Sequence, residues 1–218
     1  MLNNKKDLLI LIPAFNEGKT IQEIIKKAKK YGDILIVDDG SKDETVKNSK
    51  QNGVKVISHK TNLGYNQAIY TGYKYFLKKK YNKIISIDAD GQLPPIYIKI
   101  FNKNLINNVH VVCGVRQKVT RFGEKFFIFF SKLFFGLDDP LCGLKGFTYN
   151  FIKKNYKNPK FDTINTELII RAKKNSYKVK HIKIDNRLRK DESRFGQGAK
   201  INFFIIFTFL KCFFYINK

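Results

Sequence analysis

The sequence contains few of the residues that build disulfide-rich folds and imidazole metal sites. Its 218 residues include only three cysteines and three histidines. Cys113, Cys142 and Cys212 are odd in number and far apart, which excludes a disulfide framework and a zinc knuckle and indicates a reducing, cytosolic location. The histidines are equally scattered, so no histidine-based metal site is expected.

No apolar run is long enough to serve as a leader or to cross a bilayer. The run at 8–12 is too short for the core of a signal peptide and leads directly into a proline, so we interpret it as a buried strand. The apolar segment 201–216 is interrupted by Thr208 and Lys211 and falls short of the roughly 20 residues that a span requires. This segment is expected to lie on a membrane surface. Because no repeat or linker interrupts the chain, one domain is expected.

Acidic residues are scarce in this chain. Asp and Glu total 18 against 42 Lys and Arg, which gives a formal net charge of +24. A charge of this size points to a polyanionic partner, which could be nucleic acid, an anionic membrane surface or phosphorylated substrates. Phenylalanines lie beside the lysines, as at 126–130, and this combination favours a membrane surface over a nucleic-acid groove.

The few acidic residues concentrate where apolar runs end. Apolar strands are expected at 8–12, 34–37, 54–58 and 84–87, with helices between them at 20–28, 43–51 and 65–77. This alternation predicts an α/β fold with a mostly parallel sheet that helices cover on both faces. Because the carboxyl ends of parallel strands share one edge, the loops that follow three of the strands should meet there: 13–17, 38–41 and 88–92.

The loop after the fourth strand is the best candidate for metal binding. Asp88 and Asp90 are one residue apart, and Gln92 adds an amide oxygen two positions further on. Two carboxylates and an amide suit a hard divalent cation, Mg²⁺ or Mn²⁺, that also holds a diphosphate. The alternative is a solvated turn rich in Asp and Gly, but the buried strand that precedes it favours the metal.

The second half of the chain is rich in arginine and phenylalanine. Its expected elements are helices at 94–107 and 167–174, strands at 109–114 and 179–184, a basic loop at 116–121 and a turn-rich loop at 138–147. The segment 126–137 is predicted to be an amphipathic helix with a wide Phe-rich face. We interpret it as lying on a membrane or lining a lipid groove, and the alternative is that it only covers the sheet.

Five motifs occur in an order and spacing typical of a known enzyme family. They are IPAFNE at 12–17, VDDGSKD at 37–43, NLG at 62–64, DADGQ at 88–92 and DPLCG at 139–143. In these motifs the chain resembles family 2 glycosyltransferases, which have the Rossmann-like GT-A fold. The late segment RKDESRFG at 189–196 is similar to a loop of the polyprenyl-phosphate branch, which includes the dolichyl-phosphate mannose and glucose synthases.

The resemblance implies a division of the chain by function. Residues 1–198 would form the GT-A domain, in which 1–115 bind the nucleotide sugar and 116–198 bind the acceptor. Residues 199–218 would form an apolar tail associated with the membrane.

The same resemblance implies roles for the residues on the donor side. Asp38 and Asp39 would hydrogen-bond the base and ribose of the donor. Asp88, Asp90 and Gln92 would hold the metal on the diphosphate, with Asp90 needed for catalysis. The residues that would border the nucleotide sugar are Pro13, Ala14, Asn16, Glu17, Asn62, Gly64, Asp88 and Ala89.

On the acceptor side, the resemblance implies contacts to a phosphate. Asp139 lies where some members of the family place a catalytic base. The residues that would meet the acceptor phosphate, some of them on a closing loop, are Arg116, Arg121, Arg189, Ser193 and Arg194.

The hypothesis that results is a metal-dependent, inverting glycosyltransferase that moves a sugar from a UDP- or GDP-sugar to a polyprenyl phosphate. It would act as a peripheral enzyme at the cytoplasmic face of an anionic membrane. A close alternative uses the same donor on a sugar hydroxyl of a lipopolysaccharide or capsule glycan, which needs a general base such as Asp139.

Two other classes of protein fit the sequence less well. A basic nucleic-acid-binding protein would account for the charge, but acidic strand-end loops repel phosphate backbones, so no nucleic-acid partner is expected. A phosphatase with an aspartyl nucleophile would carry Asp-x-Asp after its first strand, whereas here it follows the fourth.

Overall fold

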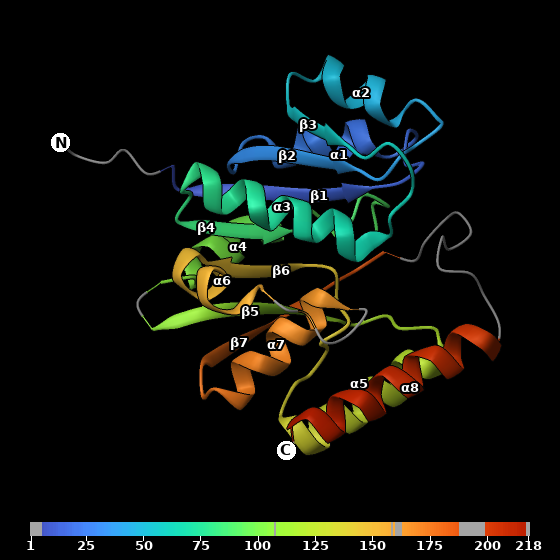
Figure 1. The fold of residues 1–218 in the computed structure, drawn as a ribbon, viewed down its shortest axis with the longest axis vertical. Coiled ribbons are helices and arrows are strands. Elements are labelled where there is room, and N and C mark those ends of the chain that lie inside the picture. Colours follow the sequence, from blue (N-terminus) through green and yellow to red (C-terminus); the bar gives the residue numbers. More distant parts are fainter. Residues whose placement is uncertain (1–5, 107, 158, 160–162, 188–198, 217–218) are drawn as a thin grey trace.

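The computed structural model describes residues 6–106, 108–157, 159, 163–187 and 199–216, and these form a seven-stranded sheet with helices on both faces (Figure 1). The strand order is β3-β2-β1-β4-β6-β5-β7. The strands are β1 (Leu8–Ala14), β2 (Asp33–Asp38), β3 (Lys55–Ser58), β4 (Lys83–Ser86), β5 (Val109–Arg116), β6 (Lys145–Thr148) and β7 (Lys178–Ile184). Within these residues every strand pairing is parallel except the two that β6 makes, which confirms the predicted mostly parallel α/β sheet.

The central strands are buried because they are apolar on both sides. Ile10 of β1 pairs with Ile34 of β2 and with Ile85 of β4, and all three side chains are buried. A parallel strand that helices cover on both faces has to be apolar at successive positions, not only at alternate ones. The continuous apolar runs of the sequence therefore predicted β1, β2 and β4 correctly.

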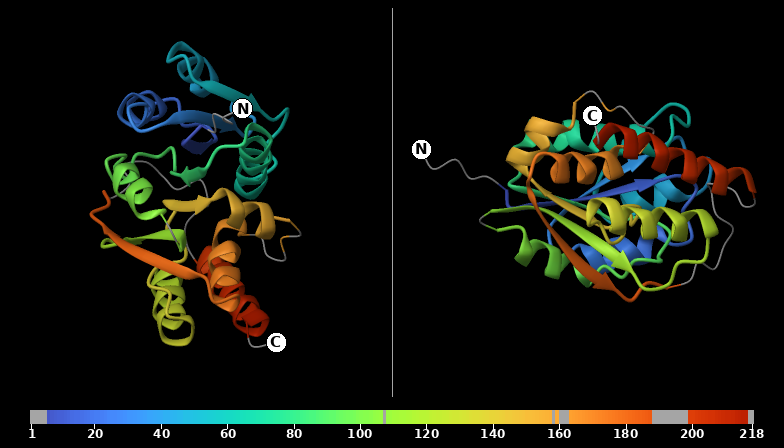
Figure 2. Two further views of the ribbon diagram at one scale, coloured as in Figure 1. Left: turned by 90° about the vertical axis from the view of Figure 1, so that its left-hand side faces the viewer. Right: turned by 90° about the horizontal axis from the view of Figure 1, so that it is seen from below.

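Helices form a layer on each face of the sheet (Figure 2). One layer contains α1 (Ile21–Ala28) and α4 (Tyr97–Asn104), with α2 (Thr45–Gln51) packed beside α1. The opposite layer contains α3 (Tyr65–Lys79), α6 (Tyr149–Asn155) and α7 (Ile164–Lys174). Two separate hydrophobic cores lie under the two layers.

Close packing of α3 depends on a glycine. A Cβ atom at Gly72 would lie 2.4 Å from the methyl carbons of Leu11 on β1. With no side chain at this position, the helix approaches the strand closely, and Ala68 one turn earlier is also buried. Overfilling such a contact typically costs about 1–3 kcal/mol.

The strand β6 and the helix α6 were not predicted. The segment 138–147 was expected to be a loop, but Lys145–Thr148 forms a strand that is antiparallel to both neighbours. Four residues with a central glycine are too short to show a period. Since β6 runs against its neighbours, its first residue, Lys145, lies opposite Ser86 and Cys113, near the carboxyl ends of β4 and β5. The loop before β6 therefore reaches the same edge as the other strand-end loops.

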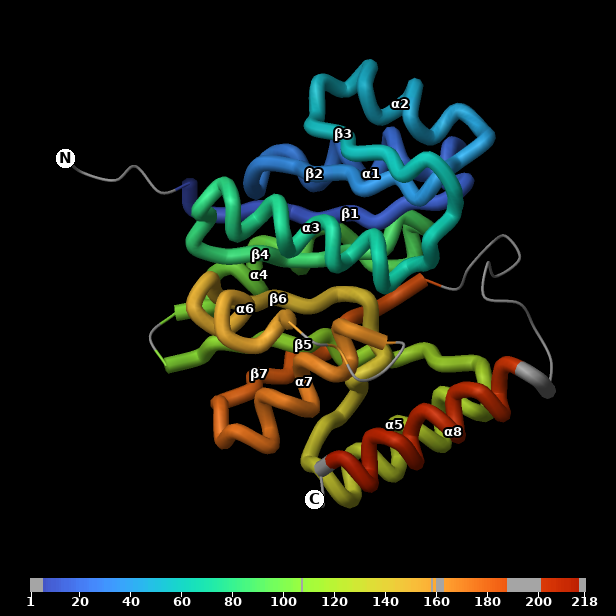
Figure 3. The backbone as a smooth tube through the Cα atoms, viewed as in Figure 1, coloured from blue at the N-terminus to red at the C-terminus, as the bar shows by residue number. Residues whose placement is uncertain are grey.

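Two Phe-rich helices, α5 (Phe122–Phe135) and α8 (Ala199–Ile216), pack against each other beyond the edge of the sheet (Figures 1 and 3). They run in the same direction, with Gly123 N donating to Asn202 Oδ1 at 2.8 Å near one end and Phe134 stacking edge-on against Phe213 near the other. The alternative that the Phe-rich helix only covers the sheet is wrong, because its main partner is α8. Among the described residues, neither helix is long and apolar enough to cross a membrane.

Candidate active site

A cavity of about 930 Å³ opens at the carboxyl edge of the sheet, where the strand-end loops meet. Its walls also include the start of α3, the start of α7 and the first residues of α8. Twelve of the residues predicted for the site line it: Pro13, Ala14, Glu17, Asp39, Asn62, Gly64, Asp88, Ala89, Asp90, Gln92, Arg116 and Arg121. The gathering of separate loops at one edge is what the parallel sheet predicts.

The other predicted residues lie elsewhere. Asn16, Asp38 and Asp139 do not line the cavity. Asn16 joins the loop 13–17 to the loop that follows β2. Its backbone N–H donates to Ser41 Oγ at 2.9 Å, and its side-chain Oδ1 accepts from Lys42 N at 2.9 Å. The predicted closing loop falls outside the described residues, including Arg189, Ser193 and Arg194.

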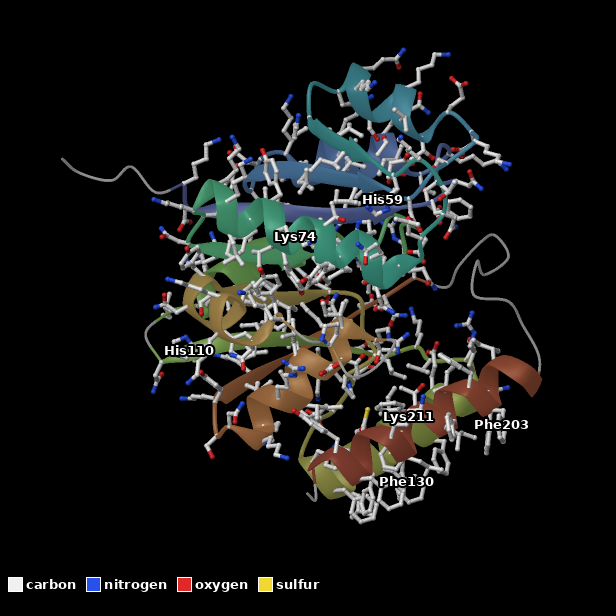
Figure 4. The ribbon with its side chains drawn as sticks, viewed as in Figure 1. His59, Lys74, His110, Phe130, Phe203 and Lys211 are labelled. Carbon is white, nitrogen blue, oxygen red and sulfur yellow. The ribbon has the colours of Figure 1, made fainter. Side chains whose placement is uncertain are left out.

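Asp39 organises the wall on the side of β2. Its carboxylate accepts hydrogen bonds from Leu63 N at 2.9 Å and Gly64 N at 2.7 Å, and it lies 2.7 Å from Nδ1 of His59 (Figure 4). The other ring nitrogen of His59 is 3.0 Å from Thr71 Oγ1. A carboxylate can only accept, so Nδ1 carries the proton toward Asp39, and in the neutral ring Nε2 accepts from the threonine. Asp39 thereby fixes the loop 62–64 at the N-terminus of α3.

The pair Asp88 and Asp90 follows β4 at the centre of the cavity. Loss of hydration at the cavity wall, followed by repulsion from Asp90, raises the pKa of Asp88 to about 6. The Tyr65 hydroxyl donates to Asp88 Oδ1 at 3.2 Å. Burial, and then the charge of Asp88, raises the pKa of that phenol above its ordinary value, so it is protonated and able to donate.

The aspartate pair suits a divalent cation. No group of three or more His, Cys, Asp or Glu side chains that could hold a metal occurs in the described part of the chain. A cation would therefore take two carboxylates from the protein, with the amide oxygen of Gln92 as a further candidate ligand, and its remaining oxygens from a bound ligand and water. Mg²⁺ is commonly bound in this way, through one or two carboxylates plus substrate phosphates. Positive charge between Asp88 and Asp90 would also relieve the repulsion that raises the pKa of Asp88.

Gly143 presses directly on Asp88. A Cβ atom at this glycine would lie 1.8 Å from Asp88 Oδ2, so no larger residue fits without moving the carboxylate. The same backbone is held by Ser86, whose hydroxyl donates to Gly143 O at 3.2 Å. The loops 139–143 and 88–92 are thus in contact, as their shared edge requires.

The arginines of the cavity are already paired with carboxylates. Arg116 makes a two-point contact with Asp139, with Nε 2.8 Å from Oδ2 and Nη2 3.1 Å from Oδ1, and its Nη1 bonds Glu124 at 3.0 Å. Burial alone would lower the pKa of Arg116, but the charges of Asp139 and Glu124 raise it above its ordinary value. Arg121 also bonds Glu124, at 3.1 Å. Arg116 and Asp139 therefore form a nearly buried ion pair, with the arginine toward the cavity.

A family model described as glycosyl transferase family 2 matches residues 9–171. The chain belongs to glycosyl transferase family 2. It is therefore a glycosyltransferase, as its motifs predicted.

Two relatives match this glycosyltransferase over nearly its whole length. An uncharacterized protein of Methanocaldococcus jannaschii is 32% identical over 95% of this chain and 92% of its own. The UDP-N-acetylglucosamine–dolichyl-phosphate N-acetylglucosaminyltransferase of Methanococcus voltae is 27% identical over 94% of this chain and 95% of its own.

Solved structures share the fold of this glycosyltransferase. A crystal structure of glucosyl-3-phosphoglycerate synthase from Mycobacterium tuberculosis with Mn²⁺, uridine diphosphate and phosphoglyceric acid has a TM-score of 0.78 at 16% identity. The match covers 95% of this chain and 78% of that one. The predicted GT-A fold is confirmed.

Several lining residues of the glycosyltransferase were missed from the sequence. Tyr65 and Asn165 belong to a buried polar network below Asp88, in which the Asn165 amide donates toward the Tyr65 hydroxyl at 3.5 Å. Glu124, just before the predicted helix 126–137, was not assigned to the site. Lys145 lies just after the DPLCG motif, and a charged residue in the short segment Leu-Lys-Gly-Phe was a signal that could have marked it.

Replacing Gly143 with alanine is expected to disable the metal site without unfolding the protein. The added Cβ displaces the Asp88 carboxylate, and a misplacement of about 1 Å can cost about a hundredfold in rate. Sugar transfer and metal-dependent binding of UDP and GDP would be measured together with the circular dichroism spectrum. Gly53→Ala, away from the cavity, is the control: no atom lies within 4 Å of a Cβ built there, and although its φ of +68° makes alanine cost about 1 kcal/mol of stability, binding and transfer should not change. Metal-dependent binding within threefold of the wild type would contradict the contact between Gly143 and Asp88.

Replacing Asp139 with asparagine is expected to lower the free energy of unfolding by about 3 kcal/mol, because it leaves Arg116 without its two-point partner. Urea denaturation measures this change. The matched control is Glu44→Gln, which breaks an exposed ion pair with Lys47 and should cost less than about 1 kcal/mol. Equal costs for the two variants would show that the Arg116–Asp139 pair is not a structural anchor.

Proposed function

We propose that this glycosyltransferase transfers a sugar from a UDP- or GDP-sugar to a polyprenyl phosphate, with Mg²⁺ or Mn²⁺ and with inversion at the anomeric carbon. The observation that carries the proposal is the position of Asp88 and Asp90 in one cavity. The same cavity is lined by Asp39 and by the basic residues Arg116, Lys118 and Arg121. The Methanococcus voltae relative, a UDP-N-acetylglucosamine–dolichyl-phosphate N-acetylglucosaminyltransferase, supports the donor and acceptor classes. The UDP and Mn²⁺ in the Mycobacterium tuberculosis structure support the cofactor.

The donor half is assigned to residues 1–115. Asp39 lines the cavity, and its Oδ2 is bonded to Gly64 N, which leaves an acceptor position on that oxygen for the base or ribose. Asp38 does not line the cavity, and its Oδ1 accepts from Ser41 N at 3.2 Å and stabilises the turn. Asp88 and Asp90 would hold the cation, with Gln92 beside them. The bound cation stabilises the negative charge that develops on the leaving nucleoside diphosphate.

The acceptor half is assigned to residues 116–198. An oxygen of the acceptor phosphate attacks the anomeric carbon from the face opposite the diphosphate. The bond between that carbon and the diphosphate oxygen breaks, and its electron pair leaves with the nucleoside diphosphate. A phosphate monoester is already ionised near neutral pH, so the step needs no general base.

The state of Asp139 favours a phosphate acceptor over a sugar hydroxyl. A hydroxyl acceptor needs a base that can reach it. Both Asp139 oxygens accept from Arg116, and the side chain is 1% exposed. A buried carboxylate whose two oxygens both accept from Arg116 is suited to positioning that arginine in the cavity lining. The glycan alternative would require Asp139 to leave this pair.

The α5–α8 pair supplies a surface for docking on a lipid bilayer. Exposed apolar side chains form a stripe on each helix: Phe122, Phe129, Leu133 and Phe134 on α5, and Phe203, Phe207, Leu210 and Phe214 on α8. The two stripes are continuous through ring contacts from Phe129 to Phe130 and Phe134, and from there to Phe213 and Phe214. Phe130 and Phe203 are labelled on this pair in Figure 4. Large exposed apolar patches of this kind are typical of interaction sites.

The docking surface is continuous with the cavity, since Phe204 and Ile205 of α8 line it. A lipid whose chain lies in the bilayer could therefore present its phosphate to the site. The net charge of +24 favours an anionic surface. The three cysteines are free and buried, which accords with a peripheral location at the cytoplasmic face.

Replacing Asp90 with alanine is expected to lower sugar transfer at least about a hundredfold, because the cation loses a ligand. Label transfer from a panel of UDP- and GDP-sugars into extractable polyprenyl phosphate, with Mn²⁺ or Mg²⁺, measures this loss. Glu44→Ala removes an exposed carboxylate away from the cavity and should leave transfer unchanged. Label in a glycan hydroxyl but never in the lipid phosphate would contradict the proposed acceptor.

Replacing Phe129 and Phe207 with aspartate is expected to weaken binding to anionic vesicles by at least about tenfold, because a charge opposes insertion of the aromatic stripes into the bilayer. Vesicle co-sedimentation of Phe129→Asp/Phe207→Asp measures this. The control is Ile106→Asp, which adds a charge at another exposed apolar residue outside both helices. Equal binding by the two variants would show that the α5–α8 pair is not the docking surface.

A further inference from the structure

One lysine of the cavity differs from the other basic residues there. Lys145, the first residue of β6, lines the cavity and is only 2% exposed. Its ammonium donates to the carbonyl oxygen of Cys142. An ammonium has three donors, and a buried charge is unfavourable unless it is paired or fully hydrogen-bonded. A buried lysine with a single neutral acceptor therefore has capacity left for an anion.

The remaining cationic side chains of the described wall each have a carboxylate partner. Arg116 bonds Asp139 and Glu124, Arg121 bonds Glu124, and Lys118 lies 3.2 Å from Asp185. Among the described residues, the bond from the Lys145 ammonium goes to a carbonyl oxygen and not to a carboxylate, and Asp88 feels the charge of Lys145 through space. Lys145 is thus the cavity cation whose charge is least compensated.

The position of Lys145 in the sheet indicates which anion it meets. Along the order β2-β1-β4-β6, Asp39 follows β2, Asp88 follows β4 and Lys145 begins β6. Lys145 pairs with Ser86, two residues before Asp88, and neighbouring strands lie about 4.8 Å apart. An anion at Lys145 would therefore lie on the far side of the aspartate pair from the Asp39 wall. With the base at the Asp39 wall and the diphosphate on the aspartate pair, as proposed, the attacking acceptor would approach from that far side.

The first turn of α7 adds to the positive potential at this place. Thr163, Asn165 and Thr166 line the cavity at the start of an 11-residue helix. The amino end of a helix carries a partial positive charge and favours phosphate. The Thr163 hydroxyl oxygen is buried and has no hydrogen-bond partner among the described residues.

We propose that Lys145, with the first turn of α7, binds the phosphate monoester of the acceptor. This proposal rests on the proposed function. The ammonium donates to oxygens of the phosphate that do not attack, which offsets the repulsion between the acceptor and the diphosphate while the attacking oxygen faces the anomeric carbon. Arg116, held by two carboxylates, then acts as part of the wall and not as the main phosphate ligand.

The test compares Lys145→Gln with Lys145→Arg in the full chain. Binding of farnesyl phosphate, farnesol and Mn²⁺–UDP or Mn²⁺–GDP is measured by titration. Losing a charge-assisted hydrogen bond is expected to weaken farnesyl phosphate binding about 10- to 100-fold in Lys145→Gln, and KM for the acceptor should rise more than kcat falls. Binding of farnesol and of the metal–nucleotide should stay within about threefold, and Lys145→Arg should recover most of the phosphate binding. Inorganic phosphate tests whether the group alone is recognised without its lipid.

Two further variants keep the test decisive. Lys118→Gln, which removes a cavity lysine that is paired with Asp185, should change phosphate binding by less than about threefold. Thr163→Val removes a hydroxyl at the same subsite and should weaken farnesyl phosphate about 3- to 10-fold, even if Lys145→Gln fails to fold.

The outcomes separate this inference from the proposed function. A weakened metal–nucleotide complex in Lys145→Gln, with unchanged farnesyl phosphate binding, would assign Lys145 to the donor and overturn the inference. Wild-type protein that binds farnesyl phosphate no better than farnesol would also overturn it. Wild-type protein that binds farnesyl phosphate through Lys145 but transfers no sugar to it would support the subsite and reject the proposed reaction.

Discussion

Repulsion between Asp88 and Asp90 is the constraint on which the site depends. Two carboxylates at the end of a buried strand are unfavourable: burial, and then the charge of Asp90, raises the pKa of Asp88. The charge of Lys145 and the hydrogen bond that Tyr65 donates to Asp88 offset this effect only in part, and a Cβ atom at Gly143 would collide with the Asp88 carboxylate. A divalent cation that binds together with an anionic ligand would neutralise this pair of carboxylates.

The antiparallel strand β6 connects the two halves of the site. It brings the loop 139–143 against Asp88 and places Lys145 at the next strand position, while the start of the same loop carries Asp139. Asp139 forms an ion pair with Arg116, which also donates a hydrogen bond to Glu124 on α5. One chain of contacts therefore runs from Asp88 to the helix pair whose aromatic residues face outward.

Much of this organisation was predictable because it follows from local patterns. Continuous apolar strands between amphipathic helices specify a parallel sheet, and the loops after β1, β2 and β4 had to meet at its edge. The pairing of Arg116 with Asp139 was not predictable, because it joins residues from β5 and from the loop before β6 through side-chain geometry. The strand β6 itself was missed because four residues show no period. His59 seemed unremarkable until the fold placed it against Asp39.

We expect the cavity to bind a nucleoside diphosphate through a divalent cation held by Asp88 and Asp90. Calorimetric titration of UDP and of GDP, each with Mn²⁺ and with EDTA, tests this most directly. Mn²⁺ is expected to strengthen the binding of one of the two nucleotides at least about tenfold. This gain should be lost in the Asp88→Ala/Asp90→Ala variant. Equal affinity with and without the cation, in a protein that is otherwise folded, would contradict it.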